Sequence, residues 1–245
     1  MGAEPALFAP SWLTYPQQPA ELPPSIWMPS FKRAESGELT VDGTPVSALV
    51  EEFQTPAYVF SEDTFRARAT EFRSAFETAF AAHGAEVSVY YAGKSFLTTA
   101  VAKWAEEEGL YLDTASGGEL ALAQRAGVPG ERIALHGNNK SVAEIRRALD
   151  YGVGRIVADS VPEVQMIASI AAEMGLVAPV MLRVTPGVHA STHDFIATAH
   201  EDQKFGQSMA AGTAPLAGLT VVELNELGIT AEDAYATVAV ALAHR

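Results

Sequence analysis

The chain has 245 residues, 48% of them hydrophobic and 19% charged, which is enough for one large folded domain or two small ones. Its formal net charge of -14 argues against a nucleic acid partner, because phosphate binding needs clustered Lys and Arg and the sequence holds no such run. The absence of cysteine excludes disulfides, thiolate metal sites and a cysteine nucleophile, and it is compatible with a cytoplasmic protein.

The amino-terminal segment, residues 1–38, is predicted to be a Pro-rich arm and not a domain. It contains seven prolines, a density that blocks both helices and central strands. Its start, MGAEPALFAP, lacks the basic region and the continuous apolar stretch of a signal peptide. No run of about 18 apolar residues occurs in the sequence, and no metal site is suggested. We therefore expect a soluble, cytoplasmic protein without a membrane partner.

Folded structure is predicted to begin at Leu39. The stretch LTVDGTPV indicates a small strand and turn, followed by a short helix over 47–53 and a strand over 57–60. Ser61 is then a plausible N-cap for a long helix. Apolar residues recur along that helix every three or four positions, at Phe65, Ala69, Phe72, Phe76 and Phe80. We expect this phenylalanine stripe to be part of the core.

The stretch VSVYYAGKSF, residues 87–96, combines strongly β-forming residues with a lysine. If it forms a buried strand, Lys94 lies at the carboxyl end with its amine aimed into a pocket above the sheet. A lysine becomes a nucleophile where a desolvated or cationic setting lowers its pKa from about 10.4, so Lys94 is a candidate reactive residue. A solvent-exposed lysine at a strand end is the alternative.

The strand and helix unit then repeats along the chain. Strands are predicted at 110–113, 132–135, 155–158 and 180–184, and helices at 95–108, 117–126, 141–151 and 161–174. Strands separated by helices of this length predict βαβ units, and hence a parallel sheet with right-handed crossovers.

A polar residue closes each of five strands, at intervals of 19, 23, 23 and 24 residues: Lys94, Asp113, His136, Asp159 and Arg183. This near-constant period predicts a (β/α) barrel, in which catalytic groups come from the carboxyl ends of successive strands. We expect the polar residues to cluster at one face of the sheet. A doubly wound open sheet is the main rival, but its phosphate-binding glycine fingerprint is absent after the first strand.

Six stretches between about Leu39 and Ala211 match one family in order and spacing: YYAGKSF, LDTASGGEL, LHGNNKS, IVADS, MLRVTPGV and FIATAHEDQKFG. By these the chain resembles the barrel-type pyridoxal-phosphate decarboxylases, and among them the actinobacterial type that acts on diaminopimelate. The resemblance implies an α/β fold, a parallel (β/α) barrel of the alanine-racemase/decarboxylase type, and pyridoxal 5'-phosphate as cofactor. It also implies the decarboxylation of meso-diaminopimelate to L-lysine by a homodimer.

Carried over by residue, the resemblance implies that Lys94 forms the Schiff base with the cofactor aldehyde. It implies that Asp113 lies beside the cofactor ring and that Arg183 reaches toward the cofactor. These roles suit the chemistry, because the cofactor ring delocalises the carbanion left by decarboxylation while the protein orients the scissile bond and tunes the surrounding charge. Two structural alternatives stay open: Asp113 could cap the following helix, and Arg183 could pair with Asp159.

Further site candidates come from the same motifs. His136, in LHGNNKS, is a candidate for binding the cofactor, although a hydrogen-bonded core histidine would give the same sequence. Asn138, His189 and His193 are candidates for contacting the amino-acid substrate or for supporting residues that do.

The resemblance ends at about Ala211. The family's later barrel strands bring a histidine that stacks on the cofactor, a triple-glycine loop for its phosphate and a glutamate for its pyridine nitrogen, and a C-terminal β domain follows. None of those motifs is found; the tail, residues 212–245, instead predicts a strand over Gly218–Leu224 and a helix over Thr230–His244. Only five strands, or six with the tail, are recognised of the eight that close a barrel.

We therefore expect residues 39–211 to form a partial barrel in a truncated or rearranged form of the enzyme. An inactive fragment of that enzyme is one alternative. A related racemase, or a decarboxylase of ornithine or arginine, is another, although the motifs LHGNNKS and DQKFG weigh against it.

Overall fold

The computed structural model describes residues 20–185 and 206–208, which belong to two compact units that divide after Arg68. The predicted strand and helix of the tail lie outside these residues. None of the helices in the described ranges is both long enough and apolar enough to span a bilayer.

The first unit is built on a three-stranded antiparallel sheet. In it β1 (Phe31–Arg33) pairs with β2 (Leu39–Val41), and β2 pairs with β3 (Thr44–Pro45). Asp42 and Gly43 form the turn between β2 and β3 with positive φ angles of 48° and 81°, which this tight hairpin requires. The predicted strand and turn are thus confirmed, but ordered strand structure begins at β1 and not at Leu39. A strand is possible there because Phe31–Arg33 contains no proline.

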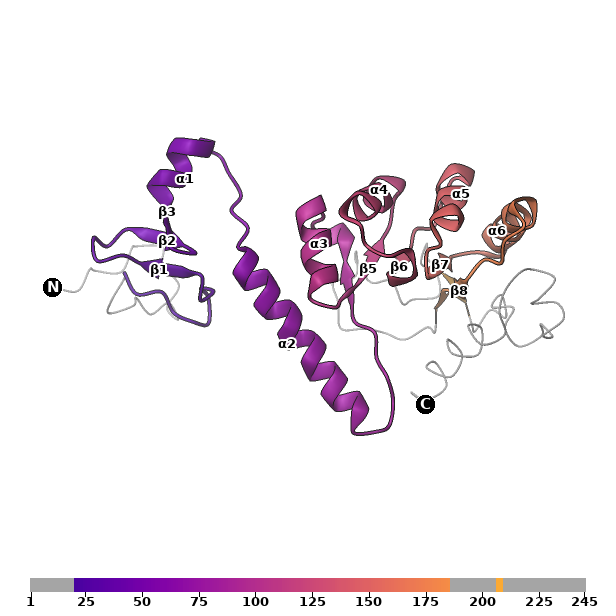
Figure 1. The fold of residues 1–245 in the computed structure, drawn as a ribbon, viewed down its shortest axis with the longest axis horizontal. Coiled ribbons are helices and arrows are strands. Elements are labelled where there is room, and N and C mark those ends of the chain that lie inside the picture. Colours follow the sequence, from indigo (N-terminus) through magenta and orange to yellow (C-terminus); the bar gives the residue numbers. More distant parts are fainter. Residues whose placement is uncertain (1–19, 186–205, 209–245) are drawn as a thin grey trace, which may run out of the picture. The chain divides into compact units, whose positions relative to one another are not determined.

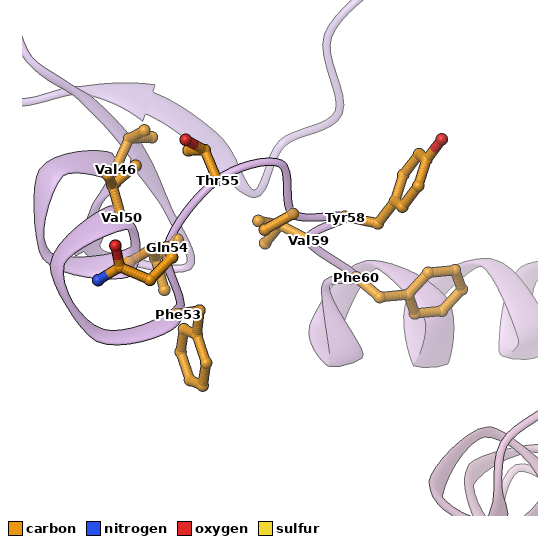
Figure 2. A pocket seen from close by; sticks show the side chains of 10 residues that line it. Val46, Val50, Phe53, Gln54, Thr55, Tyr58, Val59 and Phe60 are labelled. Carbon is orange, nitrogen blue, oxygen red and sulfur yellow. The ribbon is translucent and has the colours of Figure 1, made fainter.

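Helix α1 (Val46–Phe53) follows directly, within one residue of the prediction. The predicted strand over 57–60 is wrong, because this stretch has no regular secondary structure. A strand needs a neighbour to pair with, and the apolar run instead faces α1. Together they line an apolar hollow of about 390 Å³, into which Val50 and Val59 contribute side chains (Figure 2).

Helix α2 (Glu62–Ala81) begins as predicted at Ser61, whose Oγ accepts a hydrogen bond from the Thr64 N–H at 3.1 Å. The expectation that its apolar stripe is core is wrong for Phe72, Phe76 and Phe80, which are 50%, 45% and 41% exposed, and is confirmed for Ala69, which is buried. The helix instead meets the end of the next helix through a polar edge. There the Arg73 guanidinium donates to the Glu108 carbonyl at 2.9 Å.

The second unit contains five parallel strands in sequential order: β4 (Tyr90–Ala92), β5 (Tyr111–Thr114), β6 (Ile133–Leu135), β7 (Arg155–Ala158) and β8 (Val180–Leu182). The helices between them lie along one face of the sheet (Figure 1): α3 (Thr99–Glu107), α4 (Gly117–Ala126), α5 (Val142–Tyr151) and α6 (Val161–Met174). The predicted alternation is confirmed, and the bounds of β7, α4 and α6 agree with the prediction.

Two predicted elements are divided. The helix expected from Ser95 begins instead with the 3-10 turn η1 (Gly93–Ser95), and α3 starts only after Thr98, whose side chain caps it. The strand expected over 180–184 is split into β8 and β9 (Val184–Thr185), because β9 pairs in parallel with β10 (Gln207–Ser208) in a separate two-stranded sheet.

The core lies between the sheet and its helices. Alternate strand residues, among them Leu112, Ile133, Leu135 and Ile156, face the helices and are fully buried. Their neighbours, such as Asp113, lie on the face that none of α3–α6 covers. A doubly wound sheet has helices on both faces and a reversal of strand order, whereas sequential strands with helices on one face form part of a (β/α) barrel. The described sheet is therefore an incomplete barrel of five strands.

Candidate functional site at the carboxyl ends of the strands

Lys94 lies two residues beyond the end of β4, as predicted. Its turn is closed by hydrogen bonds from the Tyr91 hydroxyl to the Phe96 carbonyl at 2.6 Å and from the Ser95 hydroxyl to the Ala92 carbonyl at 2.7 Å. The Lys94 side chain is exposed, so within residues 20–185 and 206–208 the expected desolvated pocket is not found around it. An exposed amine is, however, accessible to a ligand.

Gly93 lets this turn lie directly on the neighbouring strand. A Cβ at Gly93 would be 2.6 Å from the backbone oxygen of Asp113, a distance that real Cβ atoms do not show. The close contact with the strand that carries Asp113 therefore fixes the position of the turn that carries Lys94.

Asp113 and His136 are brought together by the pairing of β5 with β6. The register pairs Asp113 with Ala134, and the His136 Nε2 lies 3.1 Å from the Asp113 Oδ1. Both side chains are partly exposed, so His136 is not a core histidine. Asp113 does not cap α4 either, because the Ser116 hydroxyl accepts the hydrogen bond from the first turn of that helix. Both structural alternatives for these residues are thus excluded.

Arg183 follows β8 and pairs with the residue that follows β7. Its Nη1 lies 3.7 Å from the Asp159 Oδ1, so the ion pair that the sequence left open is present. Asp159 is buried, and its Oδ2 also accepts a hydrogen bond from the Gly206 N–H at 3.0 Å. The guanidinium is therefore held at the same edge of the sheet as the Asp113–His136 pair.

Of the three remaining candidates the structure describes one. Asn138 is exposed in the loop between β6 and α5. His189 and His193 lie outside the described residues, as does most of the FIATAHEDQKFG motif.

A buried ion pair below this edge was missed from the sequence. Lys140 Nζ lies 3.1 Å from Glu163 Oε2, and their side chains are only 2% and 6% exposed. Burial lowers the pKa of Lys140, while the Glu163 carboxylate opposes that change. The sequence does indicate where Glu163 lies. The spacing Ser-x-x-Glu marks a capping box at the start of a helix, and it occurs at Ser116, Ser141 and Ser160.

The spacing is realised at all three helices. Each serine hydroxyl accepts a hydrogen bond from the backbone N–H of the glutamate three residues on, at 3.2 to 3.4 Å. At α5 the box is complete, because the Glu144 carboxylate also accepts from the Ser141 N–H at 2.8 Å. The Ser141 and Gly117 donors lower the pKa of Glu144, although partial burial opposes them.

We expect Glu144→Gln to flatten the acid side of the stability profile. A carboxyl whose pKa is lowered in the folded state binds fewer protons there than in the unfolded chain. Its contribution is therefore fully present above the ordinary value of 4.5 and is lost as the pH falls through the lowered folded pKa. Urea unfolding at several pH values should show the difference between the parent chain and Glu144→Gln shrinking with acidification. A difference that stays constant from neutral to acid pH would contradict this assignment.

The sequence is similar to a known protein family and to curated proteins of that family. Residues 63–230 match the family model for the pyridoxal binding domain of pyridoxal-dependent decarboxylases. Over 193 residues the chain is 49% identical to the diaminopimelate decarboxylase of Mycobacterium tuberculosis, covering 79% of this chain and 42% of that protein. It is 44% identical over 181 residues to the diaminopimelate decarboxylase of Bacillus subtilis, covering 74% and 40%.

A solved structure shows the same likeness. The crystal structure of diaminopimelate decarboxylase from M. jannaschii in co-complex with L-lysine superposes with a TM-score of 0.70 at 29% identity, covering 82% of this chain and 46% of that one. The chain thus spans less than half the length of the relatives it matches.

Proposed function

The chain belongs to the pyridoxal-dependent decarboxylases, and from this premise we propose that it decarboxylates meso-diaminopimelate to L-lysine with pyridoxal 5'-phosphate as cofactor. The observation that carries the proposal is the edge of the sheet described above, where Lys94, the Asp113–His136 pair and Arg183 lie at the carboxyl ends of four strands. The relatives at 49% and 44% identity support the choice of substrate. A homodimer, a cytoplasmic location and the absence of a nucleic acid partner belong to the same proposal.

The chemistry of these groups suits the cofactor. Lys94 offers an accessible primary amine that can hold an aldehyde covalently, and Arg183 offers a fixed cation for an anionic group. Asp113 and His136 share a contact that can hold a proton between Nε2 and Oδ1, depending on the tautomer. When bound, the cofactor supplies the electron sink for the carbanion that decarboxylation leaves. The task of the chain is then to anchor the cofactor and to place charge beside it.

The substrate is tested by direct assay. The purified chain is incubated with the cofactor and, in parallel, with meso-diaminopimelate, ornithine or arginine, and carbon dioxide and the amine products are measured. We expect release from meso-diaminopimelate alone. Faster release from ornithine or arginine would favour the related decarboxylases. Cofactor binding at Lys94 without release from any substrate would favour the alternative of an inactive form.

Gly93→Ala should weaken cofactor capture without unfolding the chain. The added methyl group must push the turn away from the Asp113 carbonyl, which displaces Lys94 from its neighbours. We expect the yield of borohydride-fixed cofactor on Lys94 to fall by about tenfold, because a change of roughly 1 Å in a positioned group has effects of this order or more. Labelling is measured by peptide mass spectrometry.

Gly118→Ala is the matched control, since a Cβ at Gly118 meets nothing closer than the Ser116 Oγ at 3.9 Å. Its labelling should equal that of the parent chain. If Gly93→Ala were labelled as well as the parent chain, the close contact between this turn and β5 would not be needed for cofactor capture at Lys94.

A further inference from the structure

Glutamates in the first turns of three helices, Glu119, Glu144 and Glu163, accept hydrogen bonds from groups in the loops that follow the strands. The Glu119 Oε2 accepts from the Ala115 N–H at 2.7 Å, within its own loop. The Glu144 Oε1 reaches back to the preceding helix and accepts from the Gly117 N–H at 2.7 Å. Glu163 also reaches back, toward the loop before α5, where its Oε1 accepts from the Lys140 N–H at 3.4 Å and its Oε2 additionally meets the lysine side chain.

That lysine, Lys140, is fully satisfied inside the protein. Its ammonium donates to the carbonyls of Gly137 at 2.6 Å and Val157 at 2.5 Å and to the Glu163 carboxylate at 3.1 Å. These three acceptors use its three N–H donors. They come from the loop after β6, from β7 and from α6, so the ammonium joins three consecutive segments of the chain.

Glu163 extends the connection to the site. Its Oε2 also accepts from the Asp159 N–H at 2.8 Å, which fixes the backbone at the residue after β7. The Asp159 carboxylate in turn faces the Arg183 guanidinium at 3.7 Å. A continuous series of contacts thus leads from the buried ammonium to an arginine at the exposed edge.

Stability alone does not account for this pair. A buried ion pair contributes little net stability compared with apolar side chains of similar volume, because both charges lose their hydration. The pair does, however, set one backbone position and the orientation of one carboxylate. Neither Ser116–Glu119 nor Ser141–Glu144 carries a comparable lysine contact among the described residues.

We propose that Lys140 and Glu163 are positioning residues that hold Arg183 in place through Asp159. The inference rests on the proposed function, in which the Arg183 cation faces an anionic group of the cofactor. Fixing a cation before the ligand arrives reduces the ordering that binding requires. The buried pair therefore raises cofactor affinity without touching the cofactor.

The test compares Glu163→Gln, Asp159→Asn and the double variant in the full chain. The apparent Kd for pyridoxal 5'-phosphate is measured from the change in cofactor absorbance. We expect each single change to raise Kd about tenfold, equivalent to the loss of one hydrogen bond to a charged group. The double variant should be no weaker than the worse single variant, because both changes interrupt the same series of contacts. Glu144→Gln, at the equivalent helix position, should leave Kd within about twofold.

A second measurement does not need the cofactor. Hydrogen exchange of the cofactor-free chain should speed up at Asp159 and around Arg183 in Glu163→Gln and not in Glu144→Gln. If Glu163→Gln does not fold, the charge-balanced Lys140→Met/Glu163→Gln variant replaces it.

Two results would overturn the inference. One is additive losses of affinity from the two single changes, and the other is unchanged exchange at Asp159 in Glu163→Gln. A parent chain that binds no cofactor at Lys94 would instead overturn the proposed function, and the exchange measurement would still decide whether Glu163 holds Asp159.

Discussion

Replacing Lys94 by alanine should abolish covalent labelling of the chain by pyridoxal 5'-phosphate and borohydride. The chain has five lysines, and one of them, Lys140, is buried in an ion pair and out of reach. Of the lysines in the described residues, only Lys94 follows a strand end at the edge that holds the Asp113–His136 pair. Among the described residues, cofactor held at that edge meets a single accessible amine, so the labelled fraction should fall by more than about tenfold in Lys94→Ala.

Lys103→Ala is the control for this prediction. Lys103 is 62% exposed on α3, with its Nζ 3.6 Å from the Glu107 Oε1, so its labelling measures nonspecific reaction with an exposed amine. Its removal should leave the labelling unchanged. An adduct spread over Lys32 and Lys103 in the parent chain, found by peptide mapping, would show that Lys94 is not the anchoring residue.

The strands and helices of the second unit could be predicted because each has a clear local signal. Gly127, Gly152 and Gly175 adopt positive φ at the ends of α4, α5 and α6, a conformation that favours glycine and stops a helix. Serines mark the starts of the same helices. The polar residues that follow the strands could then be assigned to one edge, since parallel strands all end on the same side.

Predictions failed where the outcome depends on distant parts of the chain. The phenylalanine spacing of α2 correctly shows one apolar face, but spacing does not say what covers that face. The run over 57–60 has the composition of a strand and lacks a partner to pair with. Lys140 escaped notice because lysine is rarely buried, and its three acceptors come from segments up to 23 residues away.

The buried pair supplies the second large effect that we expect. Lys140→Met should lower the free energy of unfolding by about 3–5 kcal/mol, because it leaves the Glu163 carboxylate buried without its countercharge. It also removes the donor to the Gly137 and Val157 carbonyls. Lys103→Met, on the exposed surface, should change stability by no more than about 0.5 kcal/mol. Chemical unfolding of both variants and the parent chain gives the comparison.

The pH dependence of this loss separates a buried ammonium from simple packing. Burial lowers the pKa of Lys140 below its ordinary value of 10.5, so the unfolded chain binds more protons than the folded chain between the two values. The contribution of Lys140 to the free energy of unfolding therefore rises with pH between its folded and its unfolded pKa. Methionine at position 140 does not titrate, so the variant lacks this pH dependence. The difference between the parent chain and Lys140→Met should widen as the pH rises toward 10.5. A difference that is large but independent of alkaline pH would contradict the lowered pKa, because it would show that Lys140 binds its proton equally well in the folded and the unfolded chain.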